Sequence, residues 1–492
     1  MSRKLLVDSV CGRKRLAVIE DGTLCEMHYG TETSGELSGN VYVGRVMNVL
    51  PGMNAAFVDI GLDKNAFLHA GDIKIDLRGD KALAGQLGNL SISKIARPGQ
   101  EMLVQVIREP GGSKGPRVSC HLTIPGRLLV LLPTMRYIGI SRKIEDDAMR
   151  KRLFGIAESI MAKTGIGMIM RTAAAEMSAD EISQEYAELV EKWRAMEMRG
   201  KTVKAPALIY GGDTFERMIV RDWADSADSI ETDSQDVYEA LMQEAAKTGV
   251  SSVIKLYNGS IPLFDVYRID SDYENALKHH VWLKSGGYLV IDQTEALTVI
   301  DVNTGKYTGK GSLEDTIYRT NQEAATEMAR QLRLRDIGGI VIVDFIDMTD
   351  PERREKLVEL LIEETNKDKT QVTVEGMTRL GLVELTRKKS RLTVQKKLKH
   401  VCGVCRGTGL VDDFETIAWR VVYELRRRHM QNPQQAYKVS LSGGVAGALI
   451  AIGAPAGMKV HVENVDMPDD QYIIEALDTS SLNSSIKLLR TE

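Results

Sequence analysis

The sequence predicts a multidomain α/β protein. The chain has 492 residues, which is more than a single hydrophobic core usually accommodates, so several domains are expected. Apolar residues make up 43% of the chain, and no long polar tract interrupts them, which indicates a chain that is folded almost throughout. Short β-branched runs and helical patterns both recur along the chain, as is typical of mixed α/β folds.

Composition narrows the cellular setting. No apolar run reaches transmembrane length, and the apolar residues of 1–22 are interrupted by Arg13, Lys14, Arg15 and Glu20, so neither a membrane segment nor a signal peptide is expected. Five scattered cysteines fit a reducing compartment, and a cytoplasmic location is predicted. The net charge of -4 does not indicate nucleic-acid binding, which would have to depend on local patches.

The N-terminal residues 1–36 form an antiparallel meander in the prediction, with strands at 15–20 and 24–29. A meander of this size cannot enclose a core. Residues 215–278 also contain few strand candidates, among them 216–222 and 252–254. We therefore expect the two segments to form one domain, interrupted by the residues between them.

The pattern of short strands in residues 37–121 predicts a small OB-type barrel. Five short strands with glycine turns are expected at 41–46, 55–59, 66–68, 102–108 and 117–121. The order of four short motifs in this segment resembles that of an S1 domain: GRV, AAFVDIG, FL and PGQ. Phe57 and Phe67 are candidates for stacking on single-stranded bases, and Lys114 is a candidate phosphate contact. The alternative for both phenylalanines is packing in the barrel core. Residues 72–96 look like an insertion.

Residues 122–214 form an α/β segment with strands at 128–132 and 165–170 and with helices beginning near residues 146 and 180. Arg171 and Thr172 follow the second strand. A guanidinium and a hydroxyl at a strand end are suitable donors for a terminal phosphate. The alternative is an exposed arginine with no specific role.

A candidate metal site lies between residues 286 and 347. Runs at 288–292 and 297–302 predict a hairpin, whose alternation places Asp301 and Asn303 on one face. A helix near 313–335 and a strand at 340–346 follow, and Asp344 lies near the end of that strand, whereas Asp347 points to the opposite face. Carboxylate and amide oxygens suit Mg²⁺ or Mn²⁺. The alternative is that both aspartates end strands and cap turns.

Two further features precede the C-terminal module. Residues 378–399 are rich in Lys and Arg, with Glu384 as the only acid, which fits either an RNA-backbone track or a solvated basic helix. Cys402 and Cys405 form a C-x-x-C knuckle followed by glycines, a zinc-binding geometry that lacks two of its four ligands. The missing pair comes from another copy of the chain, from His400 plus another residue, or does not exist; a redox motif fits the glycine-rich context less well.

Four long motifs, taken together, resemble the bacterial ribonuclease E/G family. They are GRVMNVLPGMNAAFVDIGLDKNAFLHAGDI at 44–73, SGGYLVIDQTEALTVIDVNTG at 285–305, ARQLRLRDIGGIVIVDFIDM at 329–348 and CGVCRGTG at 402–409. The resemblance covers essentially the whole chain. In length and layout the chain is closest to the short G-type members, which lack the disordered scaffold of the E-type enzymes.

The resemblance implies a domain plan. An RNase H-like domain, residues 1–36 and 215–278, would be interrupted by an S1 RNA-binding barrel at 37–121 and a 5′-sensor region at 122–214. A DNase I-like catalytic domain at 279–400, a zinc link at 401–414 and a small αβ domain at 415–492 would follow.

The resemblance also implies roles for individual residues. Asp301 and Asp344 would hold a catalytic Mg²⁺, and Asn303 would orient Asp301 or the scissile phosphate. Arg171 and Thr172, with the main chain near Gly126 and Val130, would grip the 5′-monophosphate of the RNA. Phe57, Phe67 and Lys114 would bind single-stranded RNA. Cys402 and Cys405 would share a structural Zn²⁺ with a second protomer, in a homodimer or homotetramer. Where the family has a basic residue that supports the sensor, this chain has Gln371, which predicts a weaker preference for 5′-monophosphate.

The function that follows is Mg²⁺-dependent endonucleolytic cleavage of single-stranded RNA, in rRNA processing and mRNA decay. The products would carry 5′-phosphate and 3′-hydroxyl ends. Two other readings remain open: a non-catalytic RNA-binding scaffold, which the intact Asp301, Asn303 and Asp344 disfavour, and a DNA-directed phosphodiesterase, which the S1-like barrel disfavours.

Overall fold

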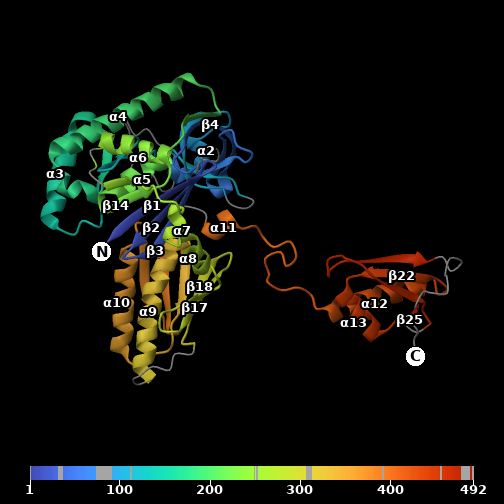
Figure 1. Ribbon diagram of the computed structural model, residues 1–492. Helices are drawn as coiled ribbons and strands as arrows, with labels where there is room; N and C mark the ends of the chain where they lie inside the picture. Colours follow the sequence, from blue (N-terminus) through green and yellow to red (C-terminus); the bar gives the residue numbers. More distant parts are fainter. Residues whose placement is uncertain are drawn as a thin grey trace. The chain divides into compact units, whose positions relative to one another are not determined.

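The computed structural model divides the chain into two compact units, Met1–Lys397 and Leu398–Glu492, and each is described by itself (Figure 1). The structure describes residues 2–31, 37–73, 91–110, 114–248, 250, 253–305, 313–389, 393–454, 457–477 and 488–489. In these ranges no helix has the length and apolarity needed to cross a membrane.

The first sheet joins the two ends of an interrupted segment. Its order is β15 (Val253–Leu256), β14 (Ser229–Thr232), β1 (Arg3–Val10), β2 (Arg13–Glu20) and β3 (Thr23–Thr31). β1 pairs with β14 in parallel and with β2 in antiparallel orientation. One face packs on α5 (Phe215–Trp223) and α6 (Gln235–Thr248), and the other on α7 (Leu263–Val266) and α8 (Ile269–Ala276). The N-terminal meander is therefore completed by strands from beyond residue 228.

Residues 216–222 were expected as a strand, and that prediction is wrong because they lie in α5. The Thr214 side chain accepts a hydrogen bond from the Arg217 amide and caps the helix. Ile219, Val220 and Trp223 are buried at helical spacing against the sheet. The three apolar residues of this short segment fit both the two-residue repeat of a strand and the 3.6-residue repeat of a helix. The Thr214 cap therefore favours the helix.

The second sheet closes into a five-stranded barrel. Its strands are β4 (Val41–Leu50), β5 (Ala55–Asp59), β6 (Ala66–His69), β8 (Arg117–Ser119) and β7 (Glu101–Arg108), and β4 pairs with β7 to close it. β13 (Ala207–Tyr210) adds to the free edge of β4. Part of the expected insertion belongs to the barrel: α2 (Ile92–Ile95) buries Ile92 in the barrel core, and the Ile92 amide donates to Asn54 Oδ1 at 2.8 Å. Residues 74–90 lie outside the described ranges.

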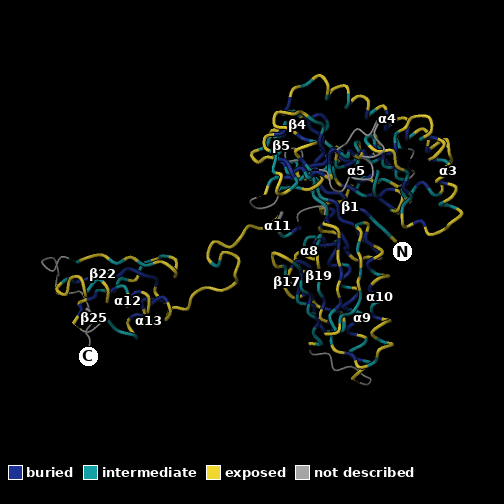
Figure 2. Tube along the Cα trace, turned by 180° about the vertical axis from the view of Figure 1, so that it is seen from behind, coloured by how far each residue is buried: buried dark blue, intermediate teal, exposed yellow. Residues whose placement is uncertain are grey.

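A third, four-stranded sheet has the order β11 (Ile138–Ile140), β12 (Gly167–Met170), β10 (Leu129–Leu132) and β9 (Ile124–Pro125). Helices α3 (Asp147–Thr164) and α4 (Ala179–Thr202) pack against it. α4 begins with a capping box between Ser178 and Glu181. Figure 2 shows long exposed stretches along both helices.

The fourth sheet positions the candidate metal site. Its order is β16 (His280–Trp282), β17 (Tyr288–Gln293), β18 (Leu297–Asn303), β19 (Gly339–Asp344), β21 (Leu382–Arg387) and β20 (Val372–Met377). Alternate residues such as Ile300, Val302, Val341 and Val343 are buried against α9 (Leu313–Leu334) and α10 (Pro351–Asn366). The residues between them, which include Asp301 and Asp344, face the other side and are exposed or half-buried.

The basic run at 378–399 is not the continuous helix that was one of its two interpretations. It contains strand β21 and then α11 (Val394–Leu398). Arg387 is buried, and its guanidinium forms ion pairs with Asp336 and Asp368, both at 2.7 Å. One cation of the run is thus committed to the fold rather than to a ligand.

The second unit is a small αβ module. α12 (Phe414–Gln431) and α13 (Gly443–Ile452) pack against a sheet with the order β24 (Tyr472–Leu477), β22 (Ala436–Leu441), β23 (Val460–Asn464) and β25 (Leu488–Leu489). The apolar stripe Ile417, Val421 and Leu425 supplies the helical side of its core.

Candidate functional site

Asp301 and Asp344 are brought side by side by the pairing of β18 and β19. The two strands are parallel, and Asp301 is the register partner of Asp344. Asp344 is exposed, and Asp301 is half-buried. Two carboxylates at the ends of adjacent strands repel each other unless a cation lies between or beside them. The arrangement is therefore suited to a divalent cation.

Asn303 orients the first of these carboxylates. Its Nδ2 donates to Asp301 Oδ2 at 2.7 Å. The turn beyond Asn303 crosses the neighbouring hairpin closely: a Cβ on Gly305, whose φ is +59°, would lie 2.4 Å from the Gly286 carbonyl oxygen. Glycine is thus required where this strand leaves the sheet.

The segment after Asp344 is held by a residue that the sequence interpretation missed. Asn321 of α9 is fully buried; its Nδ2 donates to the Ile346 carbonyl at 2.8 Å, and its Oδ1 accepts from the Ile346 amide at 3.1 Å. Arg354 Nε donates to the Met348 carbonyl at 2.6 Å. A polar Asn on the apolar face of a helix was the available signal, because such a residue needs partners when buried.

The donors of this site fit Mg²⁺. Hard oxygen ligands from one or two carboxylates are its usual protein ligands, and it keeps several waters and takes up phosphate oxygens. Within the described ranges, no group of three or more His, Cys, Asp and Glu side chains is arranged to hold a metal. A closed protein cage is thus not formed by these residues, and the Asp pair with Asn303 fits an ion completed by water and substrate.

Phe57 and Phe67 lie outside the barrel core, so the core-packing alternative is wrong for both. They are register partners on β5 and β6, with ring centroids 6.2 Å apart in an edge-to-face arrangement. Both rings are half-buried, whereas their neighbours Ala56, Val58 and Leu68 fill the core. Lys114 is exposed. A half-buried aromatic pair outside the core of a β-barrel is able to stack with unpaired bases.

Arg171 and Thr172 follow β12. Arg171 Nη1 donates to the Gly126 carbonyl at 2.7 Å, and Nη2 contacts Asp222 Oδ1 at 2.8 Å. Thr172 is exposed, and its hydroxyl lies 3.2 Å from Ser141 Oγ. Burial by itself would raise the pKa of Asp222, but the hydrogen bonds and charge of Arg221, followed by those of Arg171, hold that pKa well below its usual range.

Of the main-chain positions expected to act with Arg171, the Gly126 carbonyl contacts its guanidinium, whereas the Gly126 amide and Val130 are paired with other backbone groups. The Gly126 amide donates to the Leu129 carbonyl at 2.8 Å, and Val130 lies within β10, paired with Pro125 and Ile169. The neighbouring amides of Arg127 and Leu128 donate to the carboxylate of Glu185 on α4. Burial raises the pKa of Glu185. Glu185 thus shapes this loop, and the sequence interpretation missed it.

Cys402 and Cys405 lie in a tight turn in which the Arg406 amide donates to the Cys402 carbonyl at 2.9 Å. Cys402 is exposed and Cys405 is partly buried. His400 is exposed, and no third metal-binding side chain joins the pair among the described residues. The pair therefore supplies two thiols, two fewer than the four ligands that a tetrahedral zinc needs.

The comparisons with known proteins agree with this geometry. The family model described as Ribonuclease E/G family matches residues 123–390. The chain is 40% identical to Ribonuclease G of Salmonella typhimurium (strain SL1344), over 91% of this chain and 92% of that protein. The chain belongs to the ribonuclease E/G family. It matches Ribonuclease G of Escherichia coli (strain K12) to the same extent, and it is 33% identical to Ribonuclease E of that organism, over 96% of this chain and 45% of that protein. These relatives support the expected enzyme class, an endoribonuclease.

In this member of the ribonuclease E/G family, the loop before β20 contains Gln371 and Lys369. Gln371, where the family resemblance led us to expect a basic residue, is exposed, and its carbonyl accepts from the Lys388 amide at 2.9 Å. Lys369, two residues earlier, reaches the end of α5: its Nζ donates to the Asp222 carbonyl and lies over the Trp223 ring, 3.1 Å from the centroid. A lysine side chain therefore contacts the Asp222 segment, and Asp222 in turn pairs with Arg171.

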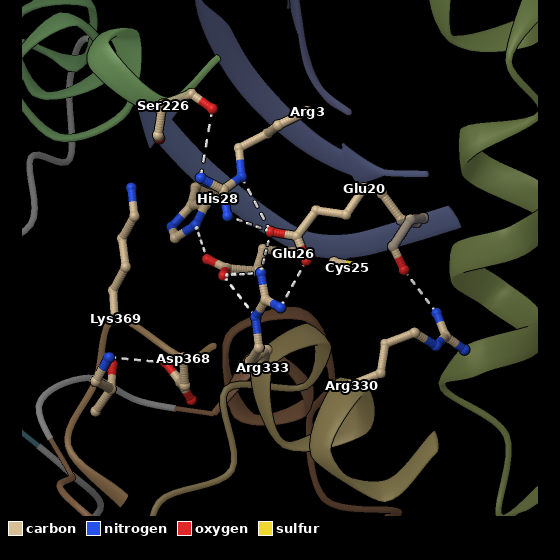
Figure 3. Close-up of polar contacts among 12 residues, drawn as sticks. Arg3, Glu20, Cys25, Glu26, His28, Ser226, Arg330, Arg333, Asp368 and Lys369 are labelled. Carbon is tan, nitrogen blue, oxygen red and sulfur yellow. Dashed lines mark hydrogen bonds and ion pairs between the residues drawn. The ribbon is translucent and has the colours of Figure 1, made fainter. Parts of the chain in front are cut away.

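The helix that carries Asn321 is also tied to the first sheet of this ribonuclease E/G family member. Figure 3 shows the guanidinium of Arg333, near the end of α9, pointing between the carboxylates of Glu20 and Glu26. Arg333 is 2.8 Å from both, and Arg3 pairs with Glu20 at the same distance. Burial alone would raise the pKa of Glu26, but His28 and then Arg333 lower it to about 2. Helix α9, which covers the fourth sheet, is thus joined to the first sheet by a buried ionic cluster.

Proposed function

We propose that the chain is a Mg²⁺-dependent endoribonuclease that cleaves single-stranded RNA and leaves 5′-phosphate and 3′-hydroxyl ends. The observation that carries the proposal is the register pair of Asp301 and Asp344 on the open face of the catalytic sheet, in a member of the ribonuclease E/G family. Its cellular roles would be rRNA processing and mRNA decay, in the cytoplasm.

Asp301 and Asp344 would hold the ion, and Asn303 keeps Asp301 in a fixed orientation by its 2.7 Å hydrogen bond. When bound, Mg²⁺ supplies Lewis-acid stabilisation of a phosphoryl oxygen and a coordinated water of lowered pKa. Water adds to the phosphorus, and the 3′-oxygen of the upstream nucleotide leaves with a proton. The exposed position of Asp344 leaves the phosphate access to the site.

The preference for single-stranded RNA would come from the barrel. Phe57 and Phe67 would stack on bases, and Lys114 would contact a phosphate. Bases offer their faces to such rings only when they are unpaired. The edge-to-face contact of the two rings pre-orders them and thereby lowers the entropy lost on binding.

The 5′-monophosphate preference would rest on Arg171 and Thr172, with the main chain at Gly126 and Val130. Arg171 keeps its guanidinium half-exposed while Gly126 and Asp222 hold it. Gln371 argues for a weaker preference, and Lys369 argues for retention, because it supports Asp222 from the same loop.

The proposed domain plan is the one implied by the family resemblance, with an RNase H-like domain, an S1 barrel, a 5′-sensor region, a DNase I-like catalytic domain, a zinc link and a small C-terminal domain. Cys402 and Cys405 would share Zn²⁺ with the same pair of a second protomer. This proposal is supported by the two-ligand knuckle, because a tetrahedral zinc needs two more ligands than it offers. The assembly would be a homodimer or a homotetramer.

One assay tests the proposal. The full chain is incubated with an AU-rich single-stranded RNA that carries a 5′-monophosphate or a 5′-triphosphate, with Mg²⁺ or with EDTA, and product ends are mapped. Internal cleavage is expected only with Mg²⁺, and faster on the monophosphorylated RNA. No cleavage of either RNA would favour a scaffold, and equal cleavage of a matched DNA would favour a general phosphodiesterase.

A further inference from the structure

The open face of the catalytic sheet carries a row of aromatic side chains that the proposed mechanism does not use. Trp282 on β16 is 69% exposed. Its ring centroid lies 5.3 Å from that of Tyr288 on β17, and Tyr288 lies at the same distance from His280. These rings are not part of the core between the sheet and its helices.

The strand register places this row beside the candidate active site. Trp282 is the partner of Tyr288, and Tyr288 is the partner of Asn303. Directly paired residues of antiparallel strands point to the same face. The row Trp282–Tyr288–Asn303 therefore crosses the sheet, and Asn303 donates to Asp301. β17 and β18 lie side by side in Figure 1.

We propose that Trp282 and Tyr288 form a stacking platform for a base next to the scissile phosphate of a single-stranded RNA. This proposal rests on the proposed function, since it assumes that the phosphate lies at Asp301 and Asp344. β16 is two strands away from β18, which is about 10 Å at the usual strand spacing. That distance suits a base adjoining the reacting phosphate rather than a distant part of the RNA.

The chemistry of the row favours a nucleobase as the occupant. The two rings meet at 58°, so Tyr288 does not stack in parallel on the indole of Trp282, which is 69% exposed. The acid nearest along β17, Asp292, already has a hydrogen-bond partner, His279 Nε2, at 2.7 Å. Every base has a π-face, so such a platform adds affinity without selecting a sequence.

Tryptophan fluorescence tests the platform separately from catalysis. The full chain in EDTA is titrated with a 5′-monophosphorylated single-stranded RNA oligonucleotide, and quenching and anisotropy are recorded. The four tryptophans include two buried ones, Trp193 and Trp223, and the exposed Trp282 and Trp419. We expect Trp282→Phe to abolish most of the quenching while retaining affinity, and the matched control Trp419→Phe to leave the quenching in place.

Truncation measures the contribution of the platform. Trp282→Ala and Tyr288→Ala are each expected to raise Kd by about 5- to 100-fold, the range of one base stacked on an aromatic ring. With Mg²⁺, kcat/KM should fall in proportion for the Ala variants and remain near the wild-type value for Trp282→Phe.

Two outcomes separate this proposal from the function on which it rests. If Trp282→Ala lowers only the melting temperature and leaves Kd and kcat/KM unchanged, the rings merely stabilise the β16–β17 hairpin and the platform is disproved. If the wild type shows RNA-dependent quenching by Trp282 but no cleavage with Mg²⁺, the platform stands and the proposed nuclease activity fails.

Discussion

Arg171 and Asp222 form an ion pair, with 2.8 Å between Arg171 Nη2 and Asp222 Oδ1, in the site proposed for the 5′-phosphate. Asp222 also forms an ion pair with Arg221, which neutralises part of its negative charge, so Arg171 is not its only cationic partner. Asp222 therefore positions the guanidinium of Arg171. In the proposed complex, a 5′-phosphate would bind the guanidinium beside Asp222 or in its place. The side chain is 30% exposed, which keeps it accessible.

We expect Arg171→Gln to remove most of the preference for 5′-monophosphorylated RNA, so that kcat/KM for monophosphorylated and 5′-hydroxyl substrates becomes equal within about twofold. The reason is the loss of a charge-assisted bidentate contact. Arg194→Gln is a matched control, because Arg194 is exposed and, among the described residues, forms an ion pair with its helical neighbour Glu191. A preference unchanged in Arg171→Gln would show that the sensor lies elsewhere.

Asp344→Asn is expected to reduce the cleavage rate at saturating Mg²⁺ by about a hundredfold or more, since loss of a metal ligand removes several kcal/mol of transition-state stabilisation. Asp347→Asn, an exposed aspartate three residues further along, should cleave at a rate close to wild type. RNA binding in EDTA should be the same for both variants. Equal activity of the two variants would contradict the site assignment.

Phe57→Ala and Phe67→Ala are each expected to weaken RNA binding by about 5- to 100-fold through the loss of base stacking. Their melting temperatures should change little, because neither ring belongs to the barrel core. Phe154→Ala on α3 removes another exposed phenylalanine and should leave Kd unchanged. Anisotropy with a labelled single-stranded RNA measures all three, and a large loss of thermal stability without loss of affinity would restore the core-packing interpretation.

Cys402→Ser is expected to abolish bound zinc, which in the wild type should amount to about 0.5 ion per chain if two knuckles share one site. Light scattering after size-exclusion chromatography should then report a smaller assembly. The exposed Cys11 provides a control, since Cys11→Ser should keep both zinc and assembly. One zinc per chain in the wild type would instead point to ligands from a single protomer.

The ionic cluster around Arg333 gives stability a defined pH dependence. Because the pKa of Glu26 is lowered to about 2 in the folded chain, its contribution is complete above its ordinary pKa of about 4.5 and is lost as the pH falls toward 2. We expect the melting temperature to decrease steadily between pH 4.5 and the onset of acid unfolding. Glu26→Gln should flatten this decrease.

Arg333→Gln is expected to destabilise the first unit at pH 7 by about 3–5 kcal/mol, because it leaves buried carboxylates without their partner. Arg194→Gln is a suitable control, since it removes a surface arginine that contributes about 0–1 kcal/mol. Scanning calorimetry of both variants provides the comparison. A melting temperature for Arg333→Gln equal to that of the control would show that the cluster does not hold the two sheets together.

Periodicity was sufficient for several parts of this protein. The alternation of 297–303 correctly placed Asp301 and Asn303 on one face, because a strand with one buried face has only one workable register. The turns and short apolar runs of 41–119 were enough to predict a five-stranded barrel. Segment 216–222 was misjudged because its three apolar residues fit a strand and a helix equally, and the Thr214 cap favours the helix.

The sequence by itself determined which side chains share a strand face, where the barrel lies, and to which family the chain is similar. Those properties depend on local periodicity and on motifs that are contiguous along the chain. Only the tertiary structure decided that Asp344 pairs with Asp301, that Asn321 holds the segment after Asp344, and that Lys369 reaches the carbonyl of Asp222. These contacts join residues far apart in the chain, and their geometry depends on how the helices pack on the sheets, which no local pattern contains.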